Sequence, residues 1–267
     1  VNDILSVPLI MIRLLRDNSL SGRDLTALHA VYCSASVCPD WVWDGIQEKL
    51  GVREITTGYG MTEVSGAAVQ NEPGDLGCLY SGYLGKVLPG GVIEYRVVKD
   101  TGEELPPGVP GELVCRGPMV AKGYFHQEEY NRKGWFHTGD IGCFTEDGYL
   151  KFIGRKNDSY KINGENVSPQ FLDMVLARCP EVVTAETVGL PDPKRGWTGA
   201  AFVETADNRE EAREAVRRFC EKALAPWQVP EYFFFGSAKQ WPRTANGKIQ
   251  KNRLRQIAQT CIAEAGE

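Results

Sequence analysis

The sequence predicts a partial α/β fold and a β-rich segment, followed by a separate α+β domain. Three observations predict this order. Short apolar runs and one amphipathic helix occupy the start, short strands broken by Gly and Pro follow from about residue 81, and helical periodicity returns after Gly154. We therefore expect a large domain over 1–154, α/β to about 80 and β-rich over 81–154, and a small domain over 155–267.

The first segment has a strand–helix–strand pattern. Residues 30–33 form a short apolar run that predicts a strand. Residues 39–50 predict a helix, because Val42, Ile46 and Leu50 fall on one stripe and Gly51 comes just past the end. Residues 55–57 predict a second strand that enters a loop at Gly58.

The middle segment reads as short strands joined by turns. Strands are predicted at 92–98, 111–116 and 149–153, the last entered through Asp147-Gly148, a dipeptide suited to a tight hairpin turn. Their regular spacing predicts a small β-barrel or sheet subdomain.

The last segment alternates helices and strands. Ser168-Pro169 predicts a helix start, with Ser as N-cap and Pro at the first helical position. Apolar residues then recur at helical spacing, and a second amphipathic stripe covers 212–224. Strands are predicted at 182–189, 200–204 and 231–235, which together with the helices indicate an α+β domain joined at 154–158.

Composition excludes several classes of protein. Hydrophobic residues make up 42% of the 267 residues, and the net charge of −5 argues against a nucleic-acid partner. No apolar run is long enough for integral membrane contact, and the start lacks a signal-peptide pattern, so we expect a cytoplasmic protein. The eight cysteines contain no Cys-x-x-Cys pair, which favours reduced thiols over a zinc site.

A glycine-flanked tyrosine is the first chemical motif. Residues 57–63 read Thr-Gly-Tyr-Gly-Met-Thr-Glu. The ring of Tyr59 can stack on a purine, Thr62 offers a hydroxyl to a phosphate, and Glu63 offers a hard oxygen to Mg²⁺. A strand-to-loop turn with a packed tyrosine explains the same letters equally well.

Two further segments carry charge next to glycine. Residues 134–140 place Asp140 on a predicted Gly turn after two aromatics, where a carboxylate can accept ribose hydroxyls. Residues 154–166 begin with Arg155, whose guanidinium suits phosphate or ribose oxygens, and continue with turn-prone residues typical of a hinge. A turn aspartate and a charged surface linker are the alternatives.

The fourth segment, 242–251, places Lys248 after a glycine near the end of the chain. A mobile lysine there can neutralise charge during phosphoryl or adenylyl chemistry. The segment lacks the first Gly and the hydroxyl of a P-loop. Taken alone, it is also typical of a basic surface tail.

The four segments in this order, with 111–118 between the first two, resemble the adenylate-forming superfamily. That superfamily includes acyl- and aryl-CoA ligases, firefly luciferases and the adenylation domains of peptide synthetases. The resemblance covers nearly the whole chain. It implies that a carboxylate attacks ATP to give an acyl-adenylate and pyrophosphate, that a thiol then displaces AMP, and that the small domain rotates between the steps.

The resemblance implies an ATP site in the large domain. Tyr59 would stack on adenine, Asp140 would bind the ribose, and Arg155 would contact ribose or phosphate. Thr62 would act catalytically by holding the α-phosphate, and Glu63 would bind Mg²⁺. The implied nucleotide-binding set is Ser34, Ala35, Ser36, Gly58, Tyr59, Gly60, Met61, Thr62, Asp140, Arg155 and Lys248.

The small domain would supply the hinge and the site that receives coenzyme A. Asn157 stands at the hinge position, where the family more often carries Asp or Lys, so the hinge energetics stay open. Lys248 would stabilise the adenylation transition state. After rotation, the CoA tunnel would be lined by Lys161, Asn163, Gly164 and Glu165.

The expected ligands are ATP or AMP, Mg²⁺, coenzyme A and a small carboxylic acid, with fatty acid metabolism as the context and a homodimer kept as an option. The family's phosphate loop has no counterpart here, and the first residue is Val. The sequence is therefore interpreted as a fragment that begins in the second α/β subdomain, and we expect it to be inactive in adenylation by itself.

Two alternatives remain beside an acyl-CoA ligase. Residues 163–169 and 248–251 favour the CoA-ligase form over the peptide-synthetase form. A stand-alone enzyme that loads a carrier protein is the first alternative, and an inactive nucleotide-binding module is the second. The identity of the acid cannot be inferred from these motifs.

Overall fold

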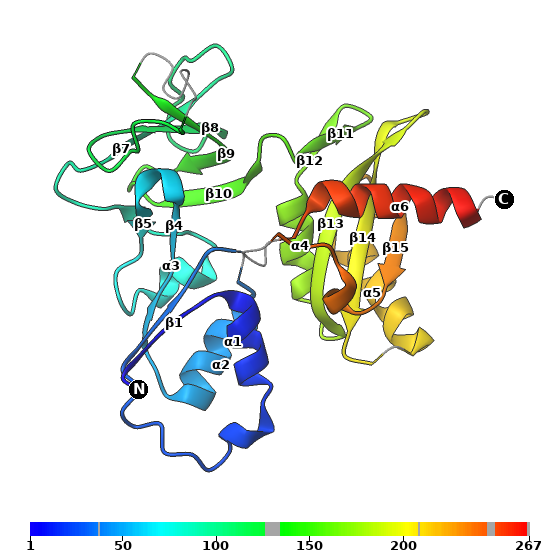
Figure 1. Ribbon diagram of the computed structural model, residues 1–267, viewed down its shortest axis with the longest axis horizontal. Helices are drawn as coiled ribbons and strands as arrows, with labels where there is room; N and C mark the ends of the chain where they lie inside the picture. The colour runs from blue at the N-terminus through cyan, green and yellow to red at the C-terminus, as the bar shows by residue number, and fades with distance from the viewer. Residues whose placement is uncertain (37, 126–133, 208, 245–248, 266–267) are drawn as a thin grey trace. The chain divides into compact units, whose positions relative to one another are not determined.

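The computed structural model describes residues 1–36, 38–125, 134–207, 209–244 and 249–265. The chain divides into two compact units, Val1–Lys156 and Asn157–Glu267 (Figure 1). The division falls two residues after the start of the small domain expected at 155. Within the described ranges, no helix combines the length and apolar character needed to span a membrane.

The first unit begins with a parallel sheet of β1 (Asp3–Ser6), β2 (Ala30–Cys33) and β3 (Glu54–Thr56), in that order. Two helices, α1 (Pro8–Leu15) and α2 (Asp40–Leu50), lie side by side over its core (Figure 1). The predicted helix at 39–50 is confirmed, since Pro39 is the N-cap and Gly51 ends the helix with φ of +71°. β1 and α1 were not predicted.

Two antiparallel sheets form the rest of this unit. One contains β4 (Gly58–Met61), β5 (Gly66–Gln70) and β6 (Lys86–Val87), and the other contains β7 (Glu94–Val98), β8 (Gly111–Arg116), β9 (Phe136–Phe144) and β10 (Leu150–Arg155) in the order β10-β9-β8-β7. Both sheets are open in the part of the chain that is described, so the barrel expectation is wrong for these strands. A 3₁₀ turn, Thr62–Val64, follows β4, and the short helix α3 (Leu76–Tyr80) follows β5.

Two local predictions in this unit are corrected. The loop expected from Gly58 is strand β4, because its residues pair with Gly66–Gln70 of β5. The turn expected at Gly139 lies inside β9, where the register with β8 shifts between Glu112 and Val114 and Gly139 has φ of +70°. Such a β-bulge bends the strand and redirects nearby side chains.

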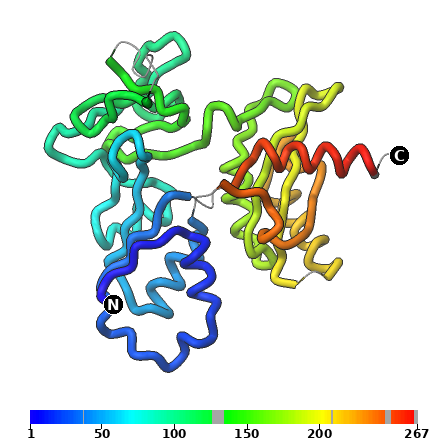
Figure 2. The backbone as a smooth tube through the Cα atoms, in the orientation of Figure 1, coloured from blue at the N-terminus to red at the C-terminus, as the bar shows by residue number. Residues whose placement is uncertain are grey.

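The second unit begins with a hairpin of β11 (Tyr160–Ile162) and β12 (Glu165–Val167). It continues with α4 (Pro169–Ala177), β13 (Val182–Asp192), β14 (Gly196–Thr205), α5 (Glu210–Ala223), β15 (Tyr232–Phe235), the 3₁₀ turn Ala238–Gln240 and α6 (Lys251–Ala265). The backbone path runs through a three-stranded sheet, β13-β14-β15 (Figure 2). The predicted cap at Ser168 is confirmed, since its hydroxyl accepts a bond from the Phe171 amide.

Helices cover both faces of this sheet. Ala201 and Val203 of β14 pack with residues of α4 and α5, whereas Ala200 and Phe202 pack with Leu254 and Ala258 of α6. The alternation follows from the two-residue period of a strand. Helix α6 was not predicted, since 242–251 was interpreted as a loop or tail.

All eight cysteines are free thiols. Six are buried, Cys38 is half-buried, and Cys261 on α6 is exposed.

Candidate nucleotide site

The Gly-Tyr-Gly motif forms the tight start of the β4–β5 hairpin. A Cβ added at Gly58 would lie 2.5 Å from the Val69 carbonyl oxygen, and one added at Gly60 would lie 1.8 Å from the Gly66 carbonyl oxygen. No side chain fits either space without moving the backbone of β5. The two glycines therefore let β4 pack closely on β5, which fixes the position of Tyr59 between them.

Tyr59 is directed into the core of the first unit. Its hydroxyl donates to Asp140 Oδ2 at 2.6 Å, and its ring packs against Tyr95 and stacks on Phe152. Burial, together with the neighbouring Asp140 carboxylate, raises the pKa of the Tyr59 phenol well above its usual value. The phenol is therefore a hydrogen-bond donor at physiological pH.

Asp140 is held between two different partners. It lies opposite Arg155 in the β9–β10 ladder, and the Arg155 Nε lies 2.9 Å from its Oδ1. The carboxylate side chain is only 1% exposed, whereas that of Arg155 is 47% exposed. Thr138 fixes the strand here, since its hydroxyl accepts from the Asp140 amide and donates to the Leu113 carbonyl. The fold brings Asp140 and Arg155 together with Tyr59, although the three residues come from separate sequence motifs.

The 3₁₀ turn after β4 presents the other two polar residues of the first motif. Thr62 is exposed, and Glu63 accepts a hydrogen bond from the Tyr124 hydroxyl. The Ala121 amide also donates to the Glu63 carbonyl oxygen at 2.8 Å. One carboxylate completed by phosphate oxygens and water is a donor set that suits Mg²⁺. Glu63 fits that ion, although the described residues contain no cluster of three potential ligands.

The loop after β2 is tied to the same hairpin. The buried Ser34 hydroxyl donates to the Gly58 carbonyl at 2.5 Å, which brings the predicted loop to the start of β4. Ala35 adopts a left-handed φ of +75°, and Ala35 and Ser36 are exposed. Gly60 is exposed beside them and Met61 is half-buried.

The predicted acceptor residues belong to the second unit. Asn163 and Gly164 form the two-residue turn between β11 and β12, with φ of +50° and +89°. Positive φ at both positions is typical of the tightest hairpin turn, for which Asn-Gly is the preferred sequence. Lys161 and Glu165 flank the turn with exposed side chains. Lys248 lies outside the described residues.

Sequence reasoning missed the side chains that support this site. The rings of Tyr95 and Phe152 pack on Tyr59. The Thr138 hydroxyl accepts a hydrogen bond from the Asp140 amide, and the Tyr124 hydroxyl donates one to Glu63. Thr138 had a local signal, since it lies two residues before Asp140 in the same motif. Phe152 lies on β10, three residues before Arg155, whereas Tyr95 and Tyr124 lie on segments where no local pattern points to the site.

Comparison with known proteins identifies the family of the chain. Residues 1–125 match the AMP-binding enzyme family, and residues 172–248 match the AMP-binding enzyme C-terminal domain. The chain belongs to the adenylate-forming superfamily of AMP-binding enzymes. Its two matched regions fall in the two structural units.

The curated relatives of the chain include acid–CoA ligases. The chain is 30% identical to the medium-chain acyl-CoA ligase ACSF2 of Mus musculus over 93% of its own length, and 36% identical to the oxalate–CoA ligase of Arabidopsis thaliana over 84%. These alignments cover 41% and 43% of the relatives, so the chain spans less than half the length of the curated relatives it matches.

Solved structures similar to this chain also include CoA ligases. The anthranilate CoA ligase AuaEII in complex with anthranoyl-AMP matches with a TM-score of 0.85 and 28% identity, over 98% of this chain and 51% of that one. The o-succinylbenzoate CoA synthetase of Bacillus subtilis in complex with OSB-AMP matches with a TM-score of 0.81 and 27% identity, over 96% of this chain and 51% of that one.

Proposed function

We propose that the protein to which this chain belongs activates a carboxylic acid with ATP and transfers the acyl group from its adenylate to coenzyme A. The observation that carries the proposal is the buried Asp140 carboxylate, held by the Tyr59 phenol and the Arg155 guanidinium. A carboxylate with a neutral, replaceable donor on one oxygen can accept a ribose hydroxyl without losing its cationic partner.

In the first step, ATP replaces internal contacts of the first unit. A ribose hydroxyl takes the place of the Tyr59 hydroxyl on Asp140, and Arg155 remains beside the carboxylate. Tyr59 is 7% exposed, so its stacking on adenine requires the ring to turn away from Phe152. Thr62 donates to the α-phosphate, and Glu63 would hold Mg²⁺, which would supply positive charge beside the phosphates.

In the second step, the second unit rotates about Asn157 and presents its hairpin. Lys161, Asn163, Gly164 and Glu165 then line the path of the CoA thiol, and Lys248 leaves the site. The exposed side chains around the two-residue turn support this role, since they are free of the core of their own unit. The finer expectations of Mg²⁺ dependence, cytoplasmic location and fatty acid metabolism belong to the same proposal.

The decisive variant is Lys248→Ala in the full-length protein. Acyl-adenylate formation should slow by on the order of 100-fold or more, because the ammonium stabilises charge that develops on the α-phosphate and the attacking carboxylate. Thioester formation from supplied acyl-AMP should stay nearly unchanged. Single-turnover kinetics of each half-reaction measures both, and equal slowing of the two steps would contradict the two-step assignment.

The complementary variant is Gly164→Asn, which should slow thioester formation and spare adenylation. A Cβ at Gly164 has no heavy atom within 4 Å, so the added side chain occupies open space rather than the core. Asn is chosen because it tolerates a positive φ better than other residues with a side chain. Replacing CoA by a carrier protein as acceptor in the same assay separates a CoA ligase from a carrier-loading enzyme.

The 267-residue chain itself gives a further test. By itself it should not catalyse acid-dependent exchange of labelled pyrophosphate into ATP, because the Gly-rich donors to the β- and γ-phosphates have no counterpart in it. Exchange by the isolated chain would overturn that expectation.

A further inference from the structure

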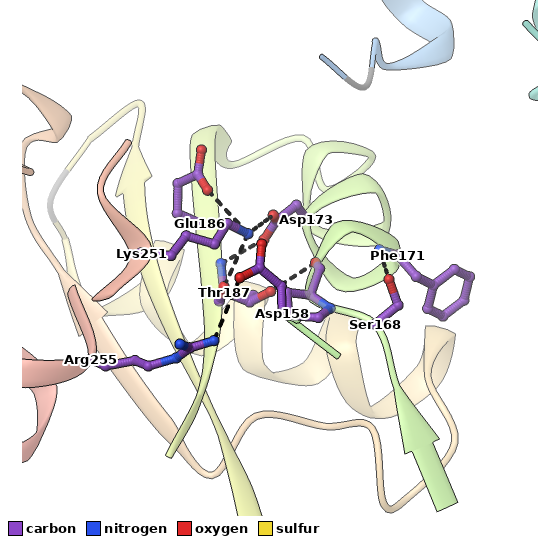
Figure 3. Close-up of polar contacts among 9 residues, drawn as sticks. Asp158, Ser168, Phe171, Asp173, Glu186, Thr187, Lys251 and Arg255 are labelled. Carbon is purple, nitrogen blue, oxygen red and sulfur yellow. Dashed lines mark hydrogen bonds and ion pairs between the residues drawn. The ribbon is translucent and has the colours of Figure 1, made fainter. Parts of the chain in front are cut away.

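Lys251, the first residue of α6, has its ammonium in a buried acidic pocket rather than in solvent. Its Nζ lies 3.0 Å from Asp173 Oδ2 on α4 and 3.4 Å from Glu186 Oε2 on β13. It also donates to the Thr187 carbonyl at 3.2 Å. Figure 3 shows the side chain reaching between the two carboxylates. Lysine is rarely buried without such pairing.

The same side chains also form hydrogen bonds with the backbone of Thr187 at the free edge of the sheet. The Thr187 amide donates to Asp173 Oδ1 at 2.6 Å, while its carbonyl accepts from Lys251. Both backbone groups point away from β14, since β13 is an edge strand. Asp173 and Lys251 therefore pair with an edge residue as well as with one another, which fixes α6 to α4 and β13.

Charged side chains on several helices and strands surround Lys251. Burial disfavours the Lys251 charge, but Asp173 and Glu186 more than offset this and raise its pKa. Arg255 lies one turn later on the same face of α6 and is 3.7 Å from Asp158. The ionisable groups that act on this pocket are Asp158, Asp173, Glu186, Arg243, Lys251 and Arg255.

The described residues just before α6, 242–244 and 249–250, are held together by contacts that we call the base. Arg243 bridges Ile249 in antiparallel fashion, and the Gln250 amide donates to the Pro242 carbonyl at 2.9 Å. The Gln250 side chain also donates to the Arg243 carbonyl at 3.0 Å. Gln250 is covalently next to Lys251, so the pocket that holds Lys251 also holds this base.

We propose that Lys251 is a positioning residue for the adenylation step: its contacts with Asp173, Glu186 and Thr187 anchor the base, whose described residues 242–244 and 249–250 stand on either side of Lys248 in the sequence. The inference rests on the proposed function, since it assigns Lys251 an effect through Lys248. Lys251 touches no substrate. It acts through the described residues of the base, which precede and follow Lys248 in the sequence.

The first test compares the two half-reactions in the full-length protein. Lys251→Met should slow acyl-adenylate formation by about 10- to 100-fold, the scale of a catalytic group displaced by about 1 Å. Thioester formation from supplied acyl-AMP should change by less than about twofold. Lys251→Arg keeps the charge and should recover part of the rate. Lys239→Met, which removes an exposed lysine near the same segment, is the matched control and should match the wild type.

The second test is a double-mutant cycle with Lys248→Ala. If Lys251 acts through Lys248, Lys251→Met should add little to the loss already caused by Lys248→Ala, because the residue to be positioned is gone. Equal slowing of both half-reactions, or a Lys251→Met effect just as large in the Lys248→Ala background, would overturn the proposal. If Lys251→Met does not fold, Glu186→Gln and Lys251→Arg go through the same cycle and decide it.

Hydrogen exchange separates this inference from the proposed function. The Gln250 amide should exchange at least about tenfold faster in Lys251→Met than in Lys239→Met, because the pocket no longer holds the base closed. If the wild type makes no acyl-AMP, the proposed function fails whatever this amide does. If the wild type and Lys248→Ala behave as proposed but Gln250 exchange is unchanged, the positioning role is wrong.

Discussion

Asp140 in the first unit is buried and Asp173 in the second is half-buried; both carboxylates are paired with a basic side chain, but the basic partners differ in exposure. Arg155, the partner of Asp140, is 47% exposed, whereas Lys251, the partner of Asp173, is 15% exposed. The other donor to Asp140 is a neutral phenol, while the other donor to Asp173 is a backbone amide of the sheet edge.

The difference distinguishes Asp140, which can exchange one hydrogen-bond donor for another, from Asp173, which cannot. A ligand hydroxyl can replace the Tyr59 phenol, because one neutral donor substitutes for another at little cost. No small molecule can replace the amide of Thr187 without opening the edge of β13. We therefore propose that the charged pair of Asp140 serves ligand binding, whereas that of Asp173 fixes geometry.

The largest expected effect is on the free energy of unfolding, when each of the two basic residues is replaced. Lys251→Met should lower the free energy of unfolding of the second unit by about 3 kcal/mol, because it leaves two carboxylates of the pocket without their cation. Arg155→Met should lower that of the first unit by about 1.5 kcal/mol, since water reaches the vacated side. Urea denaturation of each variant measures both values, and equal losses would remove the distinction between the pockets.

The exchangeable donor can be tested through ATP affinity. Asp140→Ala in the full-length protein should weaken ATP binding by about 1.5–3 kcal/mol, the scale of a charged hydrogen bond. Tyr59→Phe is the matched control, because it removes only the internal donor to the same carboxylate and leaves the ring. Isothermal titration measures both, and an unchanged affinity for Asp140→Ala would reduce Asp140 to a structural residue of β9.

The smallest expected effect concerns pH. Burial raises the pKa of Glu186 from its ordinary 4.5 to about 7, with the Asp173 carboxylate acting in the same direction. The folded protein therefore binds this proton more tightly than the unfolded chain, so the contribution to stability is full below the unfolded pKa and is lost as the pH rises through about 7.

Glu186→Gln removes that titration. The loss of stability between about pH 5 and about pH 8 should shrink by about 1 kcal/mol, since the exchanged group no longer ionises in the pocket. Denaturation midpoints at the two pH values measure the change. An equally steep pH dependence in the variant would assign the titration to another group, with Asp173 the first candidate.

Local signals in the sequence predicted much of the fold. Pro39 and Gly51 bound helix α2, and Ser168-Pro169 begins α4, because caps depend on residues next to the helix end. Closure of the β-rich segment was predicted wrongly. The spacing missed strand β9 (Phe136–Phe144), and it does not say whether the first and last strands meet, which long-range pairing decides.

The contacts around Asp140 were predicted in part, while the role of these residues stays a prediction. The motifs identified Tyr59, Asp140 and Arg155, but not the direct hydrogen bond from Tyr59 to Asp140, which joins residues 81 positions apart. Lys251 was interpreted within a basic loop or tail, because its anionic partner Asp173 lies 78 positions upstream. The burial of a charged residue depends on the whole fold, so composition near Lys251 could not predict it.

The unequal exposure of the cysteines also has a practical consequence. Cys261 lies on α6 with its thiol at the surface, whereas six of the other cysteines are enclosed by their own cores. A maleimide dye should therefore react at Cys261 long before the buried thiols. Because α6 is packed on the sheet of the second unit through Leu254 and Ala258, a fluorophore attached at Cys261 would follow that unit, and would test the proposed rotation, without any engineered change in the protein.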